Sequence, residues 1–324
     1  MEKKAAMKNP ESFAIGIDVG GTTVKGGIVN AAGEIVRRIA LDARGTEGPE
    51  VVIGVIHSVI TQLLEGKKHE NCLGIGIGCP GVVGLDGDSV SHPPNLHDWH
   101  DVKLASALKK KIALPIRVEN DANVAALAEA RFGAGKQFKD FLFVIWGTGV
   151  GGGIIYDHEI FHGPNGGAGE LGHLSINYEG PQCNCGNRGC IESYIGQRYL
   201  SMRTKSLLDR YPDSVIKELV GGDLDKIEPA IVAAASEKGD TAAIEILREA
   251  GTLLGYALAS AMNLLDLRVA VIGGGISAAP EFVYDAMTSG LHDRILRTHK
   301  PYVQALRAKL GNAAGIIGAA AMMM

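Results

Sequence analysis

Two glycine-rich turns, each set between a pair of apolar strands, constrain the fold of this chain more than any other feature. The first strand–turn–strand pattern runs from Phe13 through Gly20 and Gly21 to Asn30, and the second covers 141–156. A dinucleotide-binding fold is disfavoured, because it would open with a strand and a crossover helix rather than a hairpin. The two copies lie about one domain's length apart, so we interpret them as the starts of two related halves.

Alternating strands and helices are predicted for the rest of the chain. The predicted helices cover 49–65, 102–112, 122–132 and 313–321, the predicted strands cover 34–41, 73–78, 115–119 and 268–272, an irregular loop runs over 162–192, and mostly helix follows to 265. This alternation predicts an α/β fold. We expect residues 1–118 to form a small N-terminal domain and residues 119–311 a large C-terminal domain. The last helix, at about 312–324, is expected to pack back on the first domain.

Charge and composition narrow the classes of partner. Lys and Arg number 32 and Asp and Glu 36, and the resulting net charge of −4 argues against nucleic acid as the main partner. No apolar stretch reaches the roughly 18 residues of a membrane span. The polar segment 1–12 also lacks the apolar core of a secretory signal. We therefore expect a cytoplasmic protein that binds neither nucleic acid nor membrane.

The first glycine turn carries the groups that a polyphosphate needs. Asp18 ends the strand, and the following residues include Gly20, Gly21, Thr22, Thr23 and Lys25. Glycines leave backbone N–H groups open to phosphate oxygens, and the hydroxyls and the ammonium group add further donors. A carboxylate such as that of Asp18 is a hard ligand suited to Mg²⁺. The alternative is a plain hairpin turn with exposed threonine and lysine side chains.

The second glycine turn contains Gly147, Thr148, Gly149 and Gly151, and it formally matches the pattern G-x-G-x-x-G. That pattern indicates dinucleotide binding only where a helix follows it, whereas a strand follows here. We interpret this turn as a second phosphate-binding hairpin that faces the first.

The segment 119–123 reads Glu-Asn-Asp-Ala-Asn and precedes an alanine-rich helix. Asn and Asp are preferred N-cap residues, so capping alone would explain one of them. A cap needs only one side chain, however, and a carboxylate here could accept the proton of a substrate hydroxyl during phosphoryl transfer. Asp121 is our candidate base, Asn120 is a candidate sugar ligand, and the simple cap is the alternative.

Three of the five cysteines lie close together in the sequence. Cys183, Cys185 and Cys190 follow His173, whereas Cys72 and Cys79 stand apart. Three thiolates and one imidazole complete a tetrahedral zinc site, and four protein ligands make such a site structural rather than catalytic. A disulfide is disfavoured because a cytoplasmic setting is reducing and one cysteine would remain unpaired. Cys72 and Cys79 are expected to pack as small apolar residues.

The glycine-rich segments resemble the phosphate loops of the superfamily that includes sugar kinases, hexokinase, Hsp70 and actin. The resemblance implies two ribonuclease-H-like domains around a central cleft, with ATP between paired hairpins and the zinc-binding loop in the second domain. It also implies that Gly273, Gly274 and Gly275, which end an apolar strand, form the adenosine loop. A plain strand-to-helix turn is the alternative for these three glycines.

The two hairpins, the segment 119–123, the motif Glu170-Leu-Gly-His173 and the cysteine motif are together similar to those of the ROK family. That family covers bacterial repressors, open-reading-frame proteins and sugar kinases. The similarity spans about 13–321 and is greatest to the ATP-dependent glucokinases. It implies that Asp121 is the base on the sugar 6-hydroxyl. The residues implied to contact the sugar are Gly81, Asn95, Asn120, Asp121, Glu170, His173 and Glu192, and those implied to bind zinc are His173, Cys183, Cys185 and Cys190.

The expected function is therefore ATP-dependent phosphorylation of glucose to glucose 6-phosphate, in glycolysis. The expected metal ions are Mg²⁺ and a structural Zn²⁺, and the expected assembly is a homodimer or a dimer of dimers. N-acetylglucosamine, N-acetylmannosamine, mannose and fructose stay open as substrates, because Glu192-Ser-Tyr-Ile-Gly departs from the usual glucokinase pattern. Polyphosphate stays open as the donor. A sugar-sensing repressor is less consistent with the sequence, since only about 12 residues precede the first strand and they offer no basic recognition helix.

Overall fold

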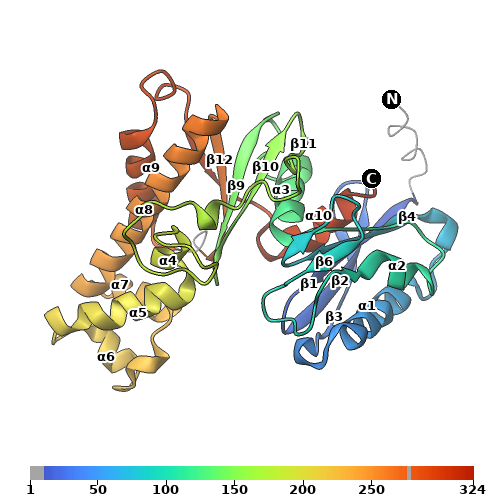
Figure 1. Cartoon of the computed structure of the whole chain (residues 1–324), viewed down its shortest axis with the longest axis horizontal. Helices are drawn as coiled ribbons and strands as arrows, with labels where there is room; N and C mark the ends of the chain where they lie inside the picture. Colours follow the sequence, from blue (N-terminus) through green and yellow to red (C-terminus); the bar gives the residue numbers. More distant parts are fainter. Residues whose placement is uncertain (1–10, 276–278) are drawn as a thin grey trace. The chain divides into compact units, whose positions relative to one another are not determined.

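The computed structural model describes residues 11–275 and 279–324 (Figure 1). These residues form two compact units. The first unit contains the chain up to Asp140 together with Gly153–Gly169 and Ala308–Met324, and the second contains Phe141–Gly152 and Glu170–Arg307. The helix that follows residue 119 thus lies in the first unit, while the domain boundary at 118/119 stays a prediction. Most of the polar N-terminal segment lies outside the described residues.

The first unit is built on a five-stranded sheet with the order β3-β2-β1-β4-β8. Its strands are β1 (Phe13–Val19), β2 (Thr23–Asn30), β3 (Ile35–Asp42), β4 (Cys72–Cys79) and β8 (Ile116–Asn120). The hairpin strands β1 and β2 are antiparallel, whereas β1, β4 and β8 are parallel. The carboxyl ends of β1, β4 and β8 therefore share one edge of the sheet, and this edge carries the candidate site.

Helix α1 (Pro49–Leu64) packs against the sheet and contributes to the core of the first unit. Its buried residues Ile56, Val59, Ile60 and Leu63 join one apolar cluster with the isoleucines of β1 and β4. A Cβ atom on Gly26 of β2 would lie 3.0 Å from Leu63, so the absence of a side chain there lets α1 approach the sheet closely.

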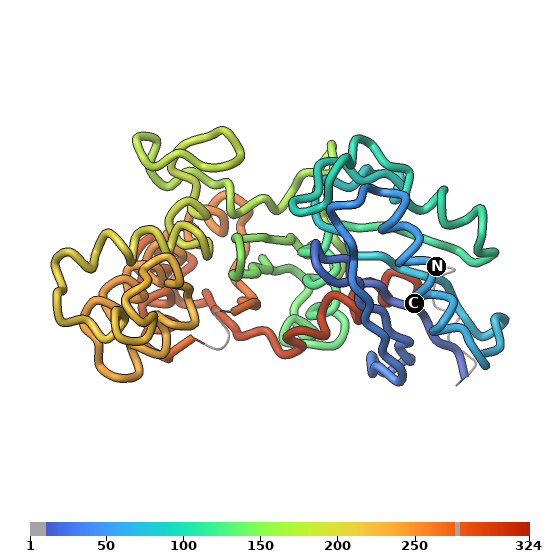
Figure 2. The backbone as a smooth tube through the Cα atoms, turned by 90° about the horizontal axis from the view of Figure 1, so that it is seen from below, coloured from blue at the N-terminus to red at the C-terminus, as the bar shows by residue number. Residues whose placement is uncertain are grey.

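Helix α10 (Ala314–Ala321) packs on β1 and β4 with almost no space between the backbones. A Cβ atom on Gly16 or Gly76 would overlap the carbonyl oxygens of Ile316 and Ala319. Helix α3 (Asp121–Phe132) lies beside α10, and there Gly318 meets the carbonyl of Val124. Figure 2 shows the C-terminal segment, in red, running among the elements of the first unit. Small residues thus let the last helix fill the second face of the sheet.

A small three-stranded sheet was not predicted. It consists of β5 (Val82–Val83), β6 (Ser89–Ser91) and β7 (Val102–Lys103) in that order. The predicted helix 102–112 was therefore wrong at its start: Val102 pairs with Val90, and α2 is confined to Leu104–Lys109. Two- and three-residue strands give no periodic signal, because their pairing depends on segments distant in the sequence.

The second sheet repeats the strand order of the first, with the order β11-β10-β9-β12-β13. Its strands are β9 (Phe141–Trp146), β10 (Val150–Tyr156), β11 (Glu159–Ile160), β12 (Val269–Gly274) and β13 (Gln304–Arg307). Strands β9, β12 and β13 are parallel. The same order in both sheets, beginning in each case from a glycine hairpin, confirms the predicted pair of ribonuclease-H-like folds. Strands β11 and β13 were not predicted.

Helices make up most of the second unit. They are α4 (Glu192–Ile195), α5 (Gln197–Leu207), α6 (Val215–Leu219), α7 (Pro229–Glu237), α8 (Thr241–Leu265) and α9 (Glu281–Arg294). The predicted helical stretch to residue 265 is confirmed, whereas α9 was missed. Helices α8 and α9 cross closely because Gly255 faces the backbone of α9. Among the described helices, none combines the length and apolarity that crossing a membrane requires.

Candidate phosphoryl-transfer and zinc sites

The carboxyl edge of the first sheet brings several predicted residues together. Asp18 is in register with Gly78 on the neighbouring strand β4, and Gly78 is in register with Glu119 on β8. Neighbouring strands lie about 4.8 Å apart, so Asp18 and the β8–α3 corner are two strand spacings apart. The thiol of Cys79 lies close to both: burial raises its pKa, and the negative charges of Asp121 and Asp18 raise it further.

The carboxylate of Asp18 is largely enclosed. Burial raises its pKa, whereas the positive charges of Lys25 and Arg38 lower it. Lys25 Nζ lies 3.9 Å from Asp18 Oδ2, and a Cβ atom on Gly315 of α10 would lie 2.8 Å from Asp18 Cγ. Burial makes the charged form of this carboxylate costly, and a bound cation would stabilise that form. A hard oxygen ligand of this kind suits Mg²⁺.

The turn between β1 and β2 has the open backbone that the sequence predicts. Gly20 N–H donates to Thr23 O (2.9 Å), and the side chain of Thr22 is exposed. Asn95 lies directly against this turn, since a Cβ atom on Gly21 would lie 2.6 Å from Asn95 Cβ. Asn95 itself has a left-handed backbone, with φ of 64°. The structure thus places Asn95 beside the first phosphate hairpin.

Gly81 lies where the loop after β4 approaches the same edge. Its φ is 90°, and a Cβ atom there would lie 2.7 Å from Pro93 Cα. Asn120 Nδ2 donates to Gly81 O (3.1 Å), which ties this loop to the end of β8. Only glycine combines this backbone conformation with so close an approach.

The β8–α3 corner settles which residue caps the helix. Asn120 Oδ1 accepts hydrogen bonds from the N–H groups of Ala122 (2.9 Å) and Asn123 (3.2 Å), so Asn120 is the N-cap. Asp121 is the first residue of α3; it is exposed, and its Oδ1 accepts from Ala122 N–H at 2.9 Å. The cap function is therefore met without Asp121, whose carboxylate lies on the site edge.

The buried carboxylate of Glu119 forms a contact that sequence analysis missed. Its Oε2 lies 2.6 Å from Nε2 of His162, which follows β11 in the same unit. Burial raises the pKa of Glu119, but hydrogen bonds from His162, Asn123 and the Asn120 N–H together outweigh this effect and lower it. The same bond raises the pKa of His162. No spacing in the sequence links these two residues.

In the second unit, the β9–β10 turn is held by the segment that follows the cysteines. Glu192 Oε2 accepts a hydrogen bond from Val150 N–H (2.9 Å), and Gln197 N–H donates to Thr148 O (3.0 Å). A side chain on Gly149 would overlap the Glu192 carboxylate. The structure thus brings Glu192 to the glycine turn Gly147–Gly151.

The three glycines 273–275 lie at the carboxyl end of β12, next to the end of β9. Gly274 is in register with Trp146, which directly precedes the glycine turn. Its φ is 84°, and a side chain there would overlap the backbone of Trp146. Both glycine segments of the second unit therefore lie at one edge of its sheet. In the first unit, the glycine hairpin and the β8–α3 corner likewise share one edge.

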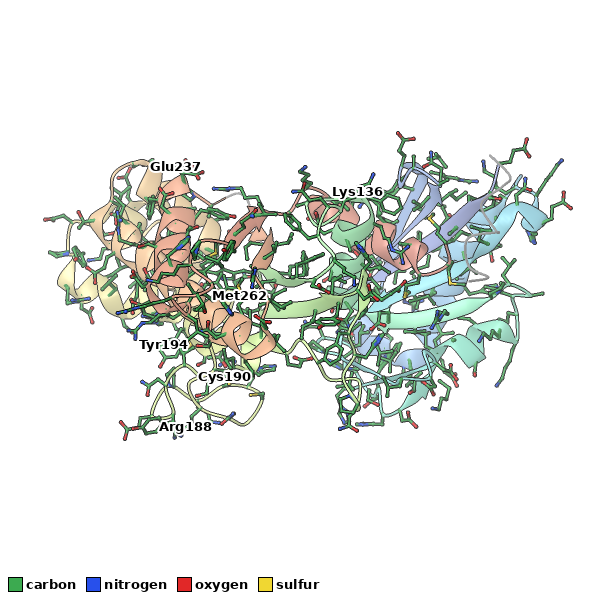
Figure 3. All side chains as sticks on the ribbon, turned by 90° about the horizontal axis from the view of Figure 1, so that it is seen from above. Lys136, Arg188, Cys190, Tyr194, Glu237 and Met262 are labelled. Atoms are coloured by element: carbon green, nitrogen blue, oxygen red, sulfur yellow. The ribbon has the colours of Figure 1, made fainter. Side chains whose placement is uncertain are left out.

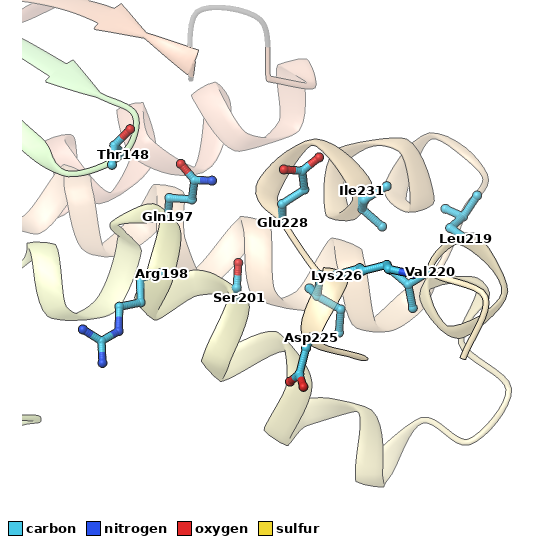
Figure 4. A pocket seen from close by; sticks show the side chains of 11 residues that line it. Thr148, Gln197, Arg198, Ser201, Leu219, Val220, Asp225, Lys226, Glu228 and Ile231 are labelled. Atoms are coloured by element: carbon cyan, nitrogen blue, oxygen red, sulfur yellow. The ribbon is translucent and has the colours of Figure 1, made fainter. Parts of the chain in front are cut away.

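A cavity of about 860 Å³ lies beside this edge in the second unit (Figure 4). Thr148 of the glycine turn and Gln197 and Ser201 of α5 line it on one side. Lys226 and Glu228, which precede α7, lie across from them in Figure 4. The cavity is large enough for a nucleoside-sized ligand, and sequence analysis did not identify it, because its walls come from separate helices.

The ligand atoms of the predicted zinc site converge. His173, Cys183, Cys185 and Cys190 place one ligand atom each within 4.8 Å of all the others. Cys183 Sγ lies 3.8 Å from His173 Nδ1, and Cys185 Sγ lies 3.6 Å from Cys190 Sγ. Tetrahedral zinc with bonds of about 2.3 Å to sulfur needs ligand atoms about 3.6–3.8 Å apart, whereas a disulfide needs about 2.05 Å. The side chains present therefore fit zinc.

The loop that carries these ligands projects from the second unit, with Arg188 toward its tip and Cys190 and Tyr194 nearer its base (Figure 3). The other ring nitrogen of His173, Nε2, lies 3.9 Å from Glu170 Oε2, which is near the carboxylate but beyond hydrogen-bond distance. A zinc-bound imidazole commonly donates its second N–H to a carboxylate, and a small shift of the exposed Glu170 side chain would be needed to form that bond. Cys72 and Cys79 are buried free thiols, as predicted.

Known proteins share this architecture. The chain matches the ROK family over residues 14–324. A glucokinase of Thermotoga maritima is 32% identical over 314 residues, covering 97% of this chain and 98% of that protein. The crystal structure of a ROK family glucokinase from Streptomyces griseus, in complex with glucose and AMPPNP, is 33% identical with a TM-score of 0.83 and covers 96% of this chain and 99% of that one. A xylose repressor of Bacillus subtilis is 28% identical over 317 residues, covering 96% of this chain and 77% of the repressor.

Proposed function

Because the chain belongs to the ROK family, we propose that it transfers the γ-phosphoryl group of ATP to the 6-hydroxyl of a hexose, and that the hexose is glucose. Its relatives at about one-third identity over nearly the whole chain are glucokinases, and the chain is an ATP-dependent sugar kinase. The observation that carries the finer proposal is the placement of Asp121: an exposed carboxylate on the same sheet edge as Asp18 and the first glycine hairpin.

Asp121 is proposed as the general base. As the new bond forms between the sugar oxygen and the γ-phosphorus, the bond from phosphorus to the oxygen bridging to the β-phosphate breaks, and the hydroxyl proton passes to Asp121. The transition state is loose, so the orientation of the hydroxyl matters more than a strongly basic carboxylate. Bound through Asp18, Mg²⁺ would neutralise charge on the phosphates.

The backbone N–H groups of both glycine turns are proposed to hold the phosphates, together with Thr22, Thr23 and Lys25. The nucleoside is proposed to occupy the cavity beside Thr148, with Gly273, Gly274 and Gly275 as the neighbouring adenosine loop. Thr148 of the glycine turn lines the cavity, and this supports placing the nucleoside there when the phosphates lie at Gly147–Gly151.

The residues proposed to contact the sugar are Gly81, Asn95, Asn120, Asp121, Glu170, His173 and Glu192. The amide of Asn120 is already bonded to the helix start and to Gly81, so we expect it mainly to fix the Gly81 backbone toward the sugar. A homodimer or dimer of dimers, a cytoplasmic location and the absence of a nucleic acid partner stay predictions.

The test is an assay of ADP release with glucose, mannose, fructose, N-acetylglucosamine and N-acetylmannosamine, and with polyphosphate in place of ATP. Glucose with ATP should give the highest kcat/KM.

Asp121→Asn should lower kcat by about 10²- to 10⁴-fold, the usual contribution of a general base, at an unchanged Tm. Asp209→Asn, an exposed aspartate of the second unit, is the matched control. Near-normal turnover in folded Asp121→Asn would remove the base assignment.

A sugar-responsive regulator is the second candidate, because the chain is similar to xylose repressors over 77% of their length. The same assay decides between the two: sugar binding without measurable phosphoryl transfer to any hexose would favour the regulator.

A further inference from the structure

The contact between Glu119 and His162 connects two segments of the first unit that are 43 residues apart in the sequence. Glu119 is 8% exposed, and its Oε1 accepts hydrogen bonds from Asn120 N–H (2.8 Å) and Asn123 Nδ2 (3.0 Å). Its Oε2 meets His162 Nε2 at 2.6 Å. Both oxygens of this buried carboxylate are therefore used, and within the described part of the chain His162 is the partner that comes from outside the corner.

Glu119 organises the corner where β8 becomes α3. It bonds to the residues on both sides of Asp121, through the Asn120 N–H and the Asn123 amide. Asn123 is 3% exposed and cannot rotate toward water instead. The direction of the backbone at Asp121 therefore depends on the position of the Glu119 carboxylate.

His162 starts the segment 162–169, which ends next to Glu170. Its carbonyl accepts a hydrogen bond from Ala168 N–H (3.1 Å), so the segment closes into a loop. Gly163, Gly166 and Gly169 have φ values of 69°, 84° and 96°. A Cβ atom on Gly166 would lie 3.3 Å from Val83 O, so the loop lies against the chain that follows Gly81.

We propose that His162 is a positioning residue for the sugar: its bond to Glu119 holds the Asp121 corner and the segment leading to Glu170 in one arrangement. The inference rests on the proposed function, because Asp121 and Glu170 are the groups proposed to contact the sugar. A buried carboxylate oxygen that loses a charge-assisted donor must find another partner or water. The corner and the loop then separate, and the groups that orient the hydroxyl are displaced while the phosphate hairpins stay as they are.

The test compares three variants of the full chain. His162→Ala removes the donor, His162→Gln keeps an N–H donor near the same place, and Glu119→Gln keeps the shape of the acceptor but not its charge. His57→Ala, at a partly buried histidine of α1, is the control. The assay measures KM for the sugar, KM for ATP and kcat, and calorimetry measures sugar binding without ATP.

His162→Ala is expected to raise KM for the sugar about tenfold or more, since losing a hydrogen bond to a charged group weakens binding by about that factor, and to leave KM for ATP within about twofold. His162→Gln should recover most of the sugar affinity, and Glu119→Gln should behave like His162→Ala.

An unchanged KM for the sugar in His162→Ala would overturn the proposal. A fall in kcat with both KM values unchanged, matched by an equal fall in the folded fraction measured by circular dichroism, would also overturn it, because the loss would then come from unfolded protein. If His162→Ala does not fold, His162→Gln and Glu119→Gln decide the question. The proposal then fails if His162→Gln loses as much sugar affinity as Glu119→Gln does.

The two proposals fail separately. If the unmodified protein phosphorylates no sugar, the proposed function fails, and calorimetry with glucose still shows whether His162→Ala weakens binding. If the unmodified protein is active and the His162 variants match it, only the positioning role fails.

Discussion

Glu192 Oε2 lies 2.9 Å from the backbone nitrogen of Val150, and this hydrogen bond joins the end of the cysteine loop to the second glycine turn. Glu192 follows the zinc-ligand candidate Cys190 by two positions, and Gly149 has no side chain where it meets the same carboxylate. Within the second unit, the metal loop and the proposed phosphate hairpin therefore form one connected structure.

Replacing Glu192 should separate its support of the second glycine turn from its proposed contact with the sugar. Glu192→Gln keeps an acceptor for Val150 N–H, whereas Glu192→Ala leaves that donor without a partner. Removing a charged hydrogen-bond partner typically costs about 1.5–3 kcal/mol, so Glu192→Ala should lower the free energy of unfolding by about that amount and raise KM for both ATP and sugar. Glu192→Gln should raise mainly the KM for the sugar. Glu237→Ala, at an exposed residue of α7, is the control for urea unfolding and kinetics. The same ATP KM in both Glu192 variants would contradict this division.

Removing the metal should weaken folding and sugar binding without abolishing the chemistry. Cys185→Ser takes away one of four ligands, and a fully protein-ligated zinc stabilises the fold but supplies no Lewis acid to the substrate. We expect the zinc content to fall well below one ion per chain, the Tm to fall, and KM for the sugar to rise more than kcat falls. Cys72→Ala, at a buried free thiol outside the cluster, should keep its zinc. Full activity in carefully prepared zinc-free protein would show that the loop needs no metal.

The contact of Glu119 with His162 should make stability depend on pH. Glu119 raises the pKa of His162 above 6.5, so this contribution is complete below about pH 6.5 and is lost as the pH rises through the folded-state value. The pKa of Glu119 is lowered below 4.5, because bonds from His162, Asn123 and Asn120 N–H outweigh the effect of burial. Its contribution is present above about pH 4.5 and is lost as the pH falls through the folded-state value.

The unfolding free energies of the unmodified protein and His162→Gln should therefore differ most between about pH 4.5 and 6.5, and less at about pH 9. Urea titrations at several pH values measure this. A difference that does not change with pH would indicate that the contact makes no ionic contribution.

The close packing of α10 on α3 should make a single methyl group costly. A Cβ atom on Gly318 would overlap the carbonyl of Val124, so Gly318→Ala should lower the free energy of unfolding by about 1–3 kcal/mol. Gly54 of α1 is the matched control, because a Cβ atom there meets nothing within 4 Å. Gly54→Ala should raise stability by about 0.5–1 kcal/mol through helix propensity. If both substitutions stabilise the protein, the two helices do not pack as closely as described.

The sequence allowed prediction of features set by local patterns. The glycine hairpins at 20–21 and 147–151 identified the start of each sheet, because glycines clustered between two apolar strands are a local signal for a turn. The cluster of Cys183, Cys185 and Cys190 with His173 was predictable for a similar reason: four ligands near one another in the sequence need only a short loop to converge.

Features set by tertiary contacts were not predictable. His162 lies in a segment with no periodic pattern, and its partner Glu119 was noted only as the first residue of the segment 119–123, with no role of its own. The cavity beside Thr148 depends on how α5 and the start of α7 lie across from each other. Strand β13 has four residues, and its place in the sheet is fixed only by pairing with β12. The roles of Asp121, Glu170 and the other proposed sugar ligands stay predictions until the variants are measured.

The backbone contacts of α10 with Gly16 and Gly76 have a consequence for biosynthesis. The ribosome makes β1 and β4 early, but the helix that covers their glycine-lined face emerges only after the whole second unit has been translated. Domains usually fold in order as they leave the ribosome, yet this sheet must wait with one face open to water. We therefore expect the nascent N-terminal half to be a substrate for chaperones, and the last helical turns to complete its folding.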